Sequence, residues 1–296
     1  MPPADTTDAP STTPQAGLET ILASEAQMKG GYGYTVPDNW RQGRTTYGGL
    51  TAGLMLQSFL SGCDADLLND DNAGAAAPQK EPVAIGSLRS ASITFIGPVA
   101  DDPVCLPSLS RRGRNVTSGF ATMHAGDALV ANGTFIFGQQ RESAICESVA
   151  APSAPAPGDC APFIPEPARP FVPIFFHNFE TRLIDGGRPS DGLARGYTRA
   201  WSRHESADAR TGIVSFLTLA DALPPAALAQ SKVFAPISTI NWLINIIEEP
   251  HTEDGWFQIE VMQTAARDGY SSQQMRFWNR QGDLIAEALQ NVAIFF

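Results

Sequence analysis

The same strand pattern occurs twice in this chain. GDALVANGTFIFG in the first half and GDLIAEALQNVAIFF at the end both run from a Gly-Asp turn into an apolar strand. Leu284 lies 155 positions after Leu129, and an earlier turn repeats too, with Arg112-Gly113 matching Asp268-Gly269. A repeat of this length, larger than a solenoid unit, predicts two similar halves.

Each half combines one helix with several strands. In the first half, GGLTAGLMLQSFL predicts a helix, followed by the strands SLRSASITFIGPV, PVCLPSLSRRG, VTSGFATMH and ALVANGTFIFG. In the second half, FHNFETRLI, LARGYTRAWSR and GIVSFLTLA predict strands, and DALPPAALAQS predicts the helix. Four more strands follow it: STINWLINIIEEP, GWFQIEVMQTAARDG, YSSQQMRFWNRQG and DLIAEALQNVAIFF.

One helix followed by antiparallel strands packs best when the sheet curls around the apolar face of the helix. A single such unit leaves a sheet edge exposed, and two units side by side cover it. We therefore expect an α+β fold made of two fused, helix-wrapped antiparallel sheets. The small residues Ala52, Gly53, Ala226 and Ala227 are expected to let strands approach the helices closely.

Composition shifts suggest where the halves begin and end. Residues 1–17 are predicted to form a disordered tail, residues 18–149 the first half and residues 174–296 the second. Between them, residues 150–173 are rich in proline, which neither donates to a sheet nor continues a helix, so an extended linker is expected. We expect it to be ordered where Phe163 and Phe171 pack. A polar stretch from Asp64 to Glu81 predicts an exposed loop.

Charge and cysteine usage narrow the class of protein. The net charge of −11 argues against a nucleic-acid partner and against docking on anionic lipid. No apolar run is long enough for a membrane span, and the first residues lack the features of a secretory signal. Four scattered cysteines and four scattered histidines show no metal-binding spacing. These features predict a cytoplasmic location and no metal site.

Several segments resemble the acyl-CoA thioesterase II (TesB-like) family of the thioesterase-like superfamily, which has a double hotdog fold. In the first half they are TTYGGLTAGLMLQS, SASITFIGP and RRGRNVTS, and in the second LTLADALPPAAL, STIN and LIAEALQN. Each motif alone is weak, but the ordered set extends over nearly the whole chain, from Leu18 to Phe296 less the linker. The resemblance implies the double hotdog fold.

The family orients a water molecule with an aspartate, a threonine and a glutamine. By these motifs the three positions fall on Asp221, Thr239 and Gln290, all in the second half. At the position matching Gln290 the first half has Phe135, so the resemblance implies that only the second half carries the chemistry. The sequence departs from many relatives at Ser92, where they often carry histidine, and at Asn241, where they often carry aspartate.

These three residue types suit thioester hydrolysis, which needs a positioned water, a proton acceptor and donors for the developing oxyanion. Asp221 precedes Pro224-Pro225, which suit a first helical turn, so we expect its carboxylate at a helix N-terminus that favours the ionised form. Thr239 offers a hydroxyl group and Gln290 an amide, and both can hold a water. Without the resemblance, a helix cap, a strand residue and a structural amide are the simpler explanations for the three residues.

Substrate contacts are predicted at three places. Gly48 and Gly49 open the first helix, either as a tight entry or as backbone donors to an oxyanion. Coenzyme A carries phosphates, and Arg111, Arg112 and Arg114 belong to a group of first-half arginines, with Arg41, Arg44 and Arg89, that either bind them or form a solvated edge. Trp242, together with Phe216, Met55 and Phe95, is expected to line the acyl pocket or simply to pack in the core.

The combined expectation is an acyl-CoA thioesterase that hydrolyses a fatty or related acyl-CoA without a cofactor. Two alternatives stay open. One is a non-catalytic acyl-CoA or lipid-binding hotdog protein. The other is a hotdog enoyl-CoA hydratase, although no histidine occupies the positions that such enzymes use. The sequence also leaves open whether the chain forms a homo-oligomer, because a fused double unit can exist alone.

Overall fold

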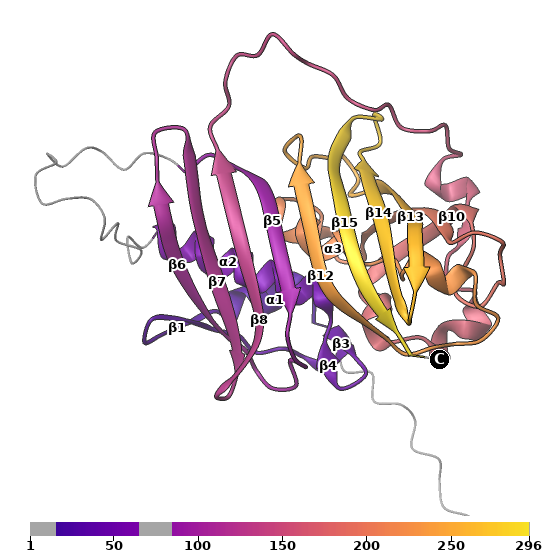
Figure 1. Cartoon of the computed structure of the whole chain (residues 1–296), viewed down its shortest axis with the longest axis horizontal. Coiled ribbons are helices and arrows are strands. Elements are labelled where there is room, and N and C mark those ends of the chain that lie inside the picture. The colour runs from indigo at the N-terminus through magenta and orange to yellow at the C-terminus, as the bar shows by residue number, and fades with distance from the viewer. Residues whose placement is uncertain (1–15, 65–84, 296) are drawn as a thin grey trace, which may run out of the picture.

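The computed structural model describes residues 16–64 and 85–295 (Figure 1). Most of the predicted tail and nearly all of the predicted loop from Asp64 to Glu81 lie outside these residues. The first half contains α1 (Leu18–Ala23), β1 (Ala26–Met28), β2 (Gly31–Gly33), β3 (Arg41–Gln42), β4 (Thr45–Thr46), α2 (Gly48–Asp64), β5 (Ser87–Phe95), β6 (Val104–Arg112), β7 (Val116–Ala125) and β8 (Ala128–Gly138). The second half contains β9 (Ala161–Pro162), β10 (Phe179–Gly186), β11 (Tyr197–His204), α3 (Ile213–Ala220), β12 (Ile237–Ile246), β13 (Phe257–Arg267), β14 (Tyr270–Trp278) and β15 (Leu284–Ile294).

In the described part of the chain, thirteen strands form one continuous sheet across both halves. Their order is β1-β2-β6-β7-β8-β5-β12-β15-β14-β13-β11-β10-β9, and neighbouring strands pair antiparallel. The halves meet at β5 and β12, where Ile93 is opposite Trp242 and Ser92 is opposite Leu243. Each half thus covers an edge of the other, as the repeat predicts.

The two main helices lie together on one face of this sheet (Figure 1). Side chains from both helices and from the inner face of the strands form one core cluster that spans the halves. Phe135 belongs to this core in the first half, where it is fully buried and its ring lies 5.9 Å from that of Phe59. The position matching Gln290 is therefore filled with carbon in the first half.

The helix of the second half differs from its prediction. GIVSFLTLA was expected to be a strand, but it supplies α3, which spans Ile213–Ala220. DALPPAALAQS was expected to be the helix, but it contains only a short 3-10 turn, η6 (Ala226–Ala229). Pro224-Pro225 follow the end of a helix instead of beginning one, and α3 has 8 residues where α2 has 17.

The proline-rich segment is more than a linker. It contains the 3-10 turns η2 (Pro157–Asp159) and η3 (Glu166–Phe171), and its strand β9 pairs with β10 and forms that edge of the sheet. Side chains of the second half donate hydrogen bonds to its carbonyl groups, among them Arg199 to Ser153 at 3.2 Å and Trp201 to Pro155 at 2.9 Å. Phe163 packs in the core as expected, whereas Phe171 is 83% exposed.

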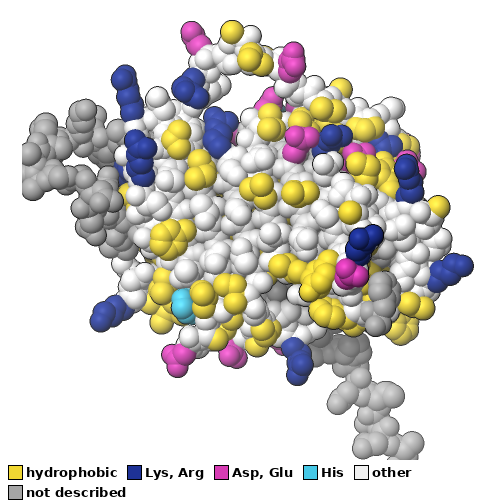
Figure 2. Space-filling view, viewed as in Figure 1, with side chains coloured by type: hydrophobic (Ala, Val, Ile, Leu, Met, Phe, Trp, Pro, Cys, Tyr) yellow, Lys and Arg dark blue, Asp and Glu magenta, His cyan; other side chains and the backbone are white. Residues whose placement is uncertain are grey.

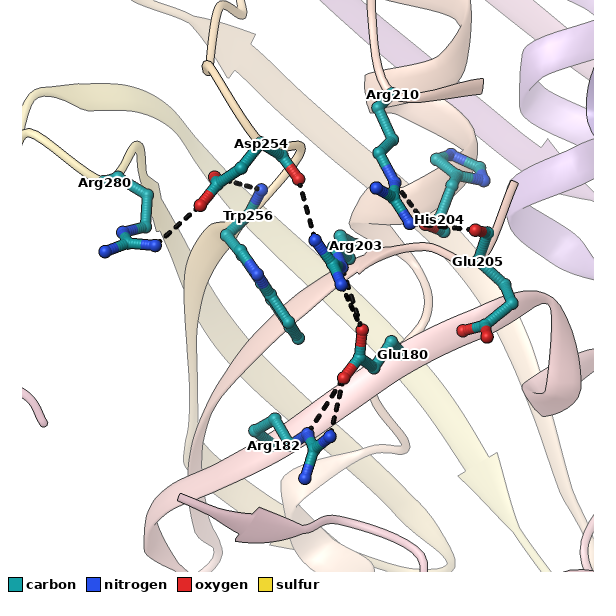
Figure 3. A network of polar contacts seen from close by, with 9 residues as sticks. All are labelled: Glu180, Arg182, Arg203, His204, Glu205, Arg210, Asp254, Trp256 and Arg280. Carbon is teal, nitrogen blue, oxygen red and sulfur yellow. Dashed lines mark hydrogen bonds and ion pairs between the residues drawn. The ribbon is translucent and has the colours of Figure 1, made fainter. Parts of the chain in front are cut away.

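Charged side chains gather away from the middle of the sheet. Figure 2 shows a face whose centre carries hydrophobic and uncharged side chains, with the charged ones mainly around it. Figure 3 shows one peripheral network, in which Glu180 accepts hydrogen bonds from Arg182 at 2.7 Å and Arg203 at 2.6 Å. The Arg203 guanidinium lies 4.5 Å from the centre of the Trp256 ring. These contacts link β10 to β11, next to the edge strand β9.

No helix among the described residues is long and apolar enough to cross a membrane.

Candidate active site

Of the three side chains predicted to orient a water, Gln290 lies within hydrogen-bonding reach of both Asp221 and Thr239. Gln290 comes from β15, Thr239 from β12, and Asp221 follows the last residue of α3. The Gln290 amide nitrogen lies 2.7 Å from the Asp221 carboxylate oxygen Oδ1 and 3.4 Å from the Thr239 hydroxyl oxygen. Thr239 and Asp221, which are 51 and 69 positions from Gln290 along the chain, are thus both brought next to its amide.

A bulge in β12 turns Thr239 toward this point. The register with β15 shifts between Thr239, which is opposite Val292, and Asn241, which is opposite Asn291. Trp242, opposite Gln290, faces the core, and regular alternation over three positions would have turned Thr239 to the other face. The extra residue, Ile240, restores Thr239 to the inner face. Sequence alternation gives no sign of this shift.

Asp221 lies at the C-terminal end of a helix, not at the N-terminal end that the sequence predicted. The dipole of α3 therefore disfavours its charge. The N-terminus of α2 provides the expected positive end instead, because the backbone N–H of Gly49 donates to the Asp221 carboxylate. Burial raises the pKa of the carboxyl group to about 7, against the lowering effect of the hydrogen bonds from Gln290 and Gly49.

The glycine pair at the start of α2 is required by close packing. A Cβ atom on Gly48 would lie 2.6 Å from Asp221 Oδ2, and one on Gly49 would lie 2.3 Å from the Thr218 carbonyl oxygen. A side chain at Gly49 would therefore clash with the backbone of α3, and one at Gly48 would have to displace the Asp221 carboxylate. The packing fits the tight helix entry predicted for the pair, and the role of the pair as donors to an oxyanion stays a prediction.

A cavity of about 1010 Å³ opens beside the three residues. Asp221, Thr239 and Gln290 line it together with Gly48. Most of the remaining wall is apolar and includes six phenylalanines and eight prolines: Phe95, Phe163, Phe171, Phe175, Phe176, Phe234, Pro98, Pro165, Pro170, Pro173, Pro189, Pro224, Pro225 and Pro236. Asp221 and Arg188 are the two charged side chains in the described lining. Such a cavity suits an apolar group, and Asp221 is the carboxyl group beside it.

Arg188 fixes the proline-rich wall of the cavity. Its guanidinium donates to the carbonyl oxygen of Phe163 at 2.7 Å and to that of Pro162 at 3.0 Å. Its backbone N–H donates to Asp191 at 2.7 Å. The segment expected to be a linker is thereby held as part of the cavity.

Four predicted substrate contacts are not brought to the cavity. Arg111 and Arg112 belong to β6 and Arg114 to the following turn, and β7 and β8 separate β6 from β5. Trp242 is fully buried in the core cluster and does not line the cavity. The sequence showed the residue types, but not the sheet order that separates them from the site. Among the other predicted pocket residues, Phe95 lines the cavity, whereas Met55 and Phe216 are core residues.

The two departures from the family pattern lie outside the cavity. Ser92 and Asn241 are exposed on the outer face of the sheet, next to buried Ile93 and Trp242. Neither lines the cavity, so the cavity wall does not differ at these positions.

Sequence reasoning missed two residues around the site. Tyr47 donates its hydroxyl to the Thr218 carbonyl oxygen at 2.9 Å, and its ring stacks on Phe175 with centres 4.2 Å apart. Burial, with the negative charge of Asp221 nearby, raises the pKa of Tyr47 well above its usual value. Gln273 is fully buried and donates to the Gln290 carbonyl oxygen. The only signal for Gln273 is an amide at an inward position of a buried strand.

Within the described residues, no group of three or more histidine, cysteine, aspartate or glutamate side chains could hold a metal ion. No histidine lines the cavity in this part of the chain. The four cysteines are free thiols.

Comparison with known structures gives the fold. A hotdog-fold protein of unknown function from Alicyclobacillus acidocaldarius has a TM-score of 0.78 and 20% identity, covering 95% of this chain and 99% of its own. The acyl-CoA thioesterase II TesB2 of Mycobacterium marinum has a TM-score of 0.66 and 16% identity, covering 94% and 98%. The tesB protein of Mycobacterium avium subspecies paratuberculosis has a TM-score of 0.69 and 13% identity, covering 94% and 99%. These likenesses confirm the predicted double hotdog fold.

Family models identify both halves. The model of the acyl-CoA thioesterase N-terminal domain matches residues 36–138, and that of the C-terminal domain matches residues 157–294. A search of curated proteins finds no match to this sequence. Because the two models occur in order and together span most of the sequence, this chain belongs to the acyl-CoA thioesterase family, in its TesB-like, double hotdog form.

Proposed function

We propose that this protein hydrolyses the thioester bond of fatty or related acyl-CoA molecules, using a water oriented by Asp221, Thr239 and Gln290. The observation that carries the proposal is a single carboxyl group in an apolar cavity, with a pKa of about 7 and an amide nitrogen 2.7 Å away. A pKa close to neutral pH is what general base catalysis requires. Family membership supports the same chemistry.

In the proposed reaction, ionised Asp221 accepts a proton from the water as the water oxygen attacks the thioester carbonyl carbon. The tetrahedral intermediate then collapses, the carbon–sulfur bond breaks, and the thiolate leaving group takes this proton from Asp221, which returns to its ionised form. The products are the free acid and coenzyme A. Thr239 holds the water through its hydroxyl group, and Gln290 fixes the carboxylate by donating to Oδ1. Holding the water against the carbonyl removes much of the entropic cost of the step.

The wall of the cavity supports an acyl group as its occupant. Its aromatic and proline side chains exclude water and offer little to a polar ligand. Burial of each methylene there is worth about 0.8 kcal/mol. The nucleotide part of coenzyme A then lies toward solvent, outside this wall.

The test is thiol release from a panel of acyl-CoA molecules, followed with a thiol reagent. Asp221→Ala is expected to lower turnover by at least about 10²-fold while the protein stays folded. Near-normal turnover in that variant would show that the site is wrongly assigned. Binding of acyl-CoA by the wild-type protein without thiol release would favour the non-catalytic alternative. Addition of water to an enoyl-CoA would favour the hydratase.

A further inference from the structure

A chain of hydrogen bonds runs from the backbone to Asp221 through two buried amides. The Ala226 N–H donates to Gln273 Oε1 at 2.9 Å. Gln273 Nε2 donates to Gln290 Oε1, and Gln290 Nε2 donates to Asp221 Oδ1 at 2.7 Å. Gln273 is fully buried and Gln290 is 3% exposed. The two glutamines are opposite each other on β14 and β15.

The direction of this chain is set at its first member. A glutamine amide can be turned by 180° with little change in shape, so its orientation depends on its partners. The Ala226 N–H begins η6, where helical backbone donors have no partner within the helix, and it can only donate. Gln273 must therefore face it with Oε1 and present Nε2 to Gln290. Gln290 must then accept with Oε1, which leaves its Nε2 for Asp221 and Thr239.

We propose that Gln273 is a positioning residue, which fixes the amide of Gln290 so that its nitrogen always points at Asp221. The proposal deepens the function proposed above and rests on it. Without Gln273, the Gln290 carbonyl oxygen is buried with no donor, and the amide can rotate. In the rotated form the oxygen faces the carboxylate, removes a hydrogen bond and disfavours its charge.

The first half of the chain lacks both amides at the matching pair of strand positions. The first-half pair in the matching place is Gly119 and Phe135, which are opposite each other on β7 and β8. A Cβ on Gly119 would lie 2.1 Å from the Phe59 ring, so that ring occupies the space beside Phe135. In the first half, where no acid lies at this place, both amides are absent and the rings of Phe59 and Phe135 occupy the space.

The other titratable and charged groups near Asp221 in the described part of the chain form no hydrogen bond with the two glutamines. Tyr47, which directly precedes α2, is a titratable group near Asp221. Burial and then the negative charge of Asp221 raise the pKa of Tyr47. Arg188 lines the same cavity but is held by the carbonyl groups of Pro162 and Phe163. Neither side chain has a hydrogen bond to Gln273 or Gln290 among the described residues. A change at Gln273 therefore acts on Asp221 through Gln290.

Two substitutions of similar size test the proposal. Gln273→Glu keeps an acceptor for the Ala226 N–H but, when ionised, cannot donate to Gln290, so Gln290 turns to donate to it. Gln273→Met removes both hydrogen-bonding ends without adding a charge. We expect the pKa of Asp221 to rise in both variants, more in Gln273→Glu. Turnover at pH 7 should fall about 10²-fold in Gln273→Glu and about tenfold in Gln273→Met.

The readouts separate this role from a purely structural one. The Asp221 pKa is measured by carbon-13 NMR of carboxyl-labelled full-length protein, with Asp221→Asn to assign the signal, and the acid limb of the pH–turnover profile should move upward with it. Gln258→Met is the matched control, because Gln258 is a buried glutamine on β13 that donates to the Pro152 carbonyl oxygen. It should lower stability without moving the Asp221 pKa.

Other outcomes overturn the proposal. An unchanged Asp221 pKa in folded Gln273→Met contradicts it, and a rise in Gln273→Glu alone would show only the effect of an added charge. If Gln273→Glu does not fold, Gln273→Met decides the question by itself. The NMR titration needs no turnover, so absence of thiol release from the wild type would refute the proposed function while leaving the orientation of Gln290 measurable.

Discussion

A carboxyl group whose pKa rises on folding binds its proton more tightly in the native state than in the unfolded chain. For Asp221 burial raises the pKa from 3.8 to about 7. Below pH 3.8 both states are protonated and Asp221 has no effect on the free energy of unfolding. Between about pH 4 and 7 the unfolded chain loses this proton first, so stability falls as pH rises. Above pH 7 the full cost, on the order of 4 kcal/mol, is present.

Asp221→Asn replaces the carboxyl group by an amide, which does not titrate. The free energy of unfolding of the variant, minus that of the wild type, should increase between about pH 4 and 7 and level off above. Denaturant unfolding of both proteins across pH 3 to 9 measures it. A difference that stays constant over this range would mean that the Asp221 carboxyl titrates normally in the folded protein. Such a gain in stability at the expense of chemistry is common at active sites.

At the scale of elements, α2 and α3 pack closely through Gly53. The sequence suggested that this small residue lets a strand approach, but a Cβ on Gly53 would lie 2.3 Å from the hydroxyl oxygen of Thr218 in α3. That hydroxyl is fully buried and donates to the Val214 carbonyl oxygen at 2.9 Å. The contact is therefore between helices, and it keeps the end of α3 against the beginning of α2.

Gly53→Ala tests this packing because two effects of opposite sign compete. In an exposed helix, alanine is more favourable than glycine by about 1 kcal/mol. Here overpacking should outweigh that gain and lower stability by about 1–3 kcal/mol. In Gly53→Ala/Thr218→Ala the close contact is relieved, so thermal unfolding should show less loss than the sum of the single variants. Additive losses would mean that Gly53 and Thr218 do not interact.

The elements that could be predicted from the sequence are those with a clear period and turns. The first helix and the strands that end each half were predicted because Gly-Asp and Arg-Gly turns separate alternating segments. The prediction of a strand at Ile213–Ala220 was wrong because this short, mostly apolar segment is buried at every position after Ile213, and its pattern does not distinguish a buried helix from a buried strand. Pro224-Pro225 suit either the start of a helix or the region after its end, and only packing decides between them.

At the scale of the whole molecule, the candidate site needs both halves. The repeat predicted two units, and the family resemblance placed the three site residues in the second. That the first half contributes the Gly49 N–H to Asp221 could not be predicted, since this contact depends on how α2 and α3 cross. The Thr239 bulge and the remote position of Arg111, Arg112 and Arg114 likewise depend on pairing between distant strands.

Gly48→Ala tests whether the first half controls chemistry assigned to the second. The new methyl group would lie 2.6 Å from Asp221 Oδ2, so the carboxylate must move away from Gly49 and from Gln290. We expect turnover with acyl-CoA to fall by about 10²-fold, since small displacements of reacting groups have effects of that size. Gly158→Ala is the control, because a Cβ there meets no atom within 4 Å. If Gly48→Ala keeps the turnover of this control, the beginning of α2 does not hold Asp221 in place, and the second half alone forms the site.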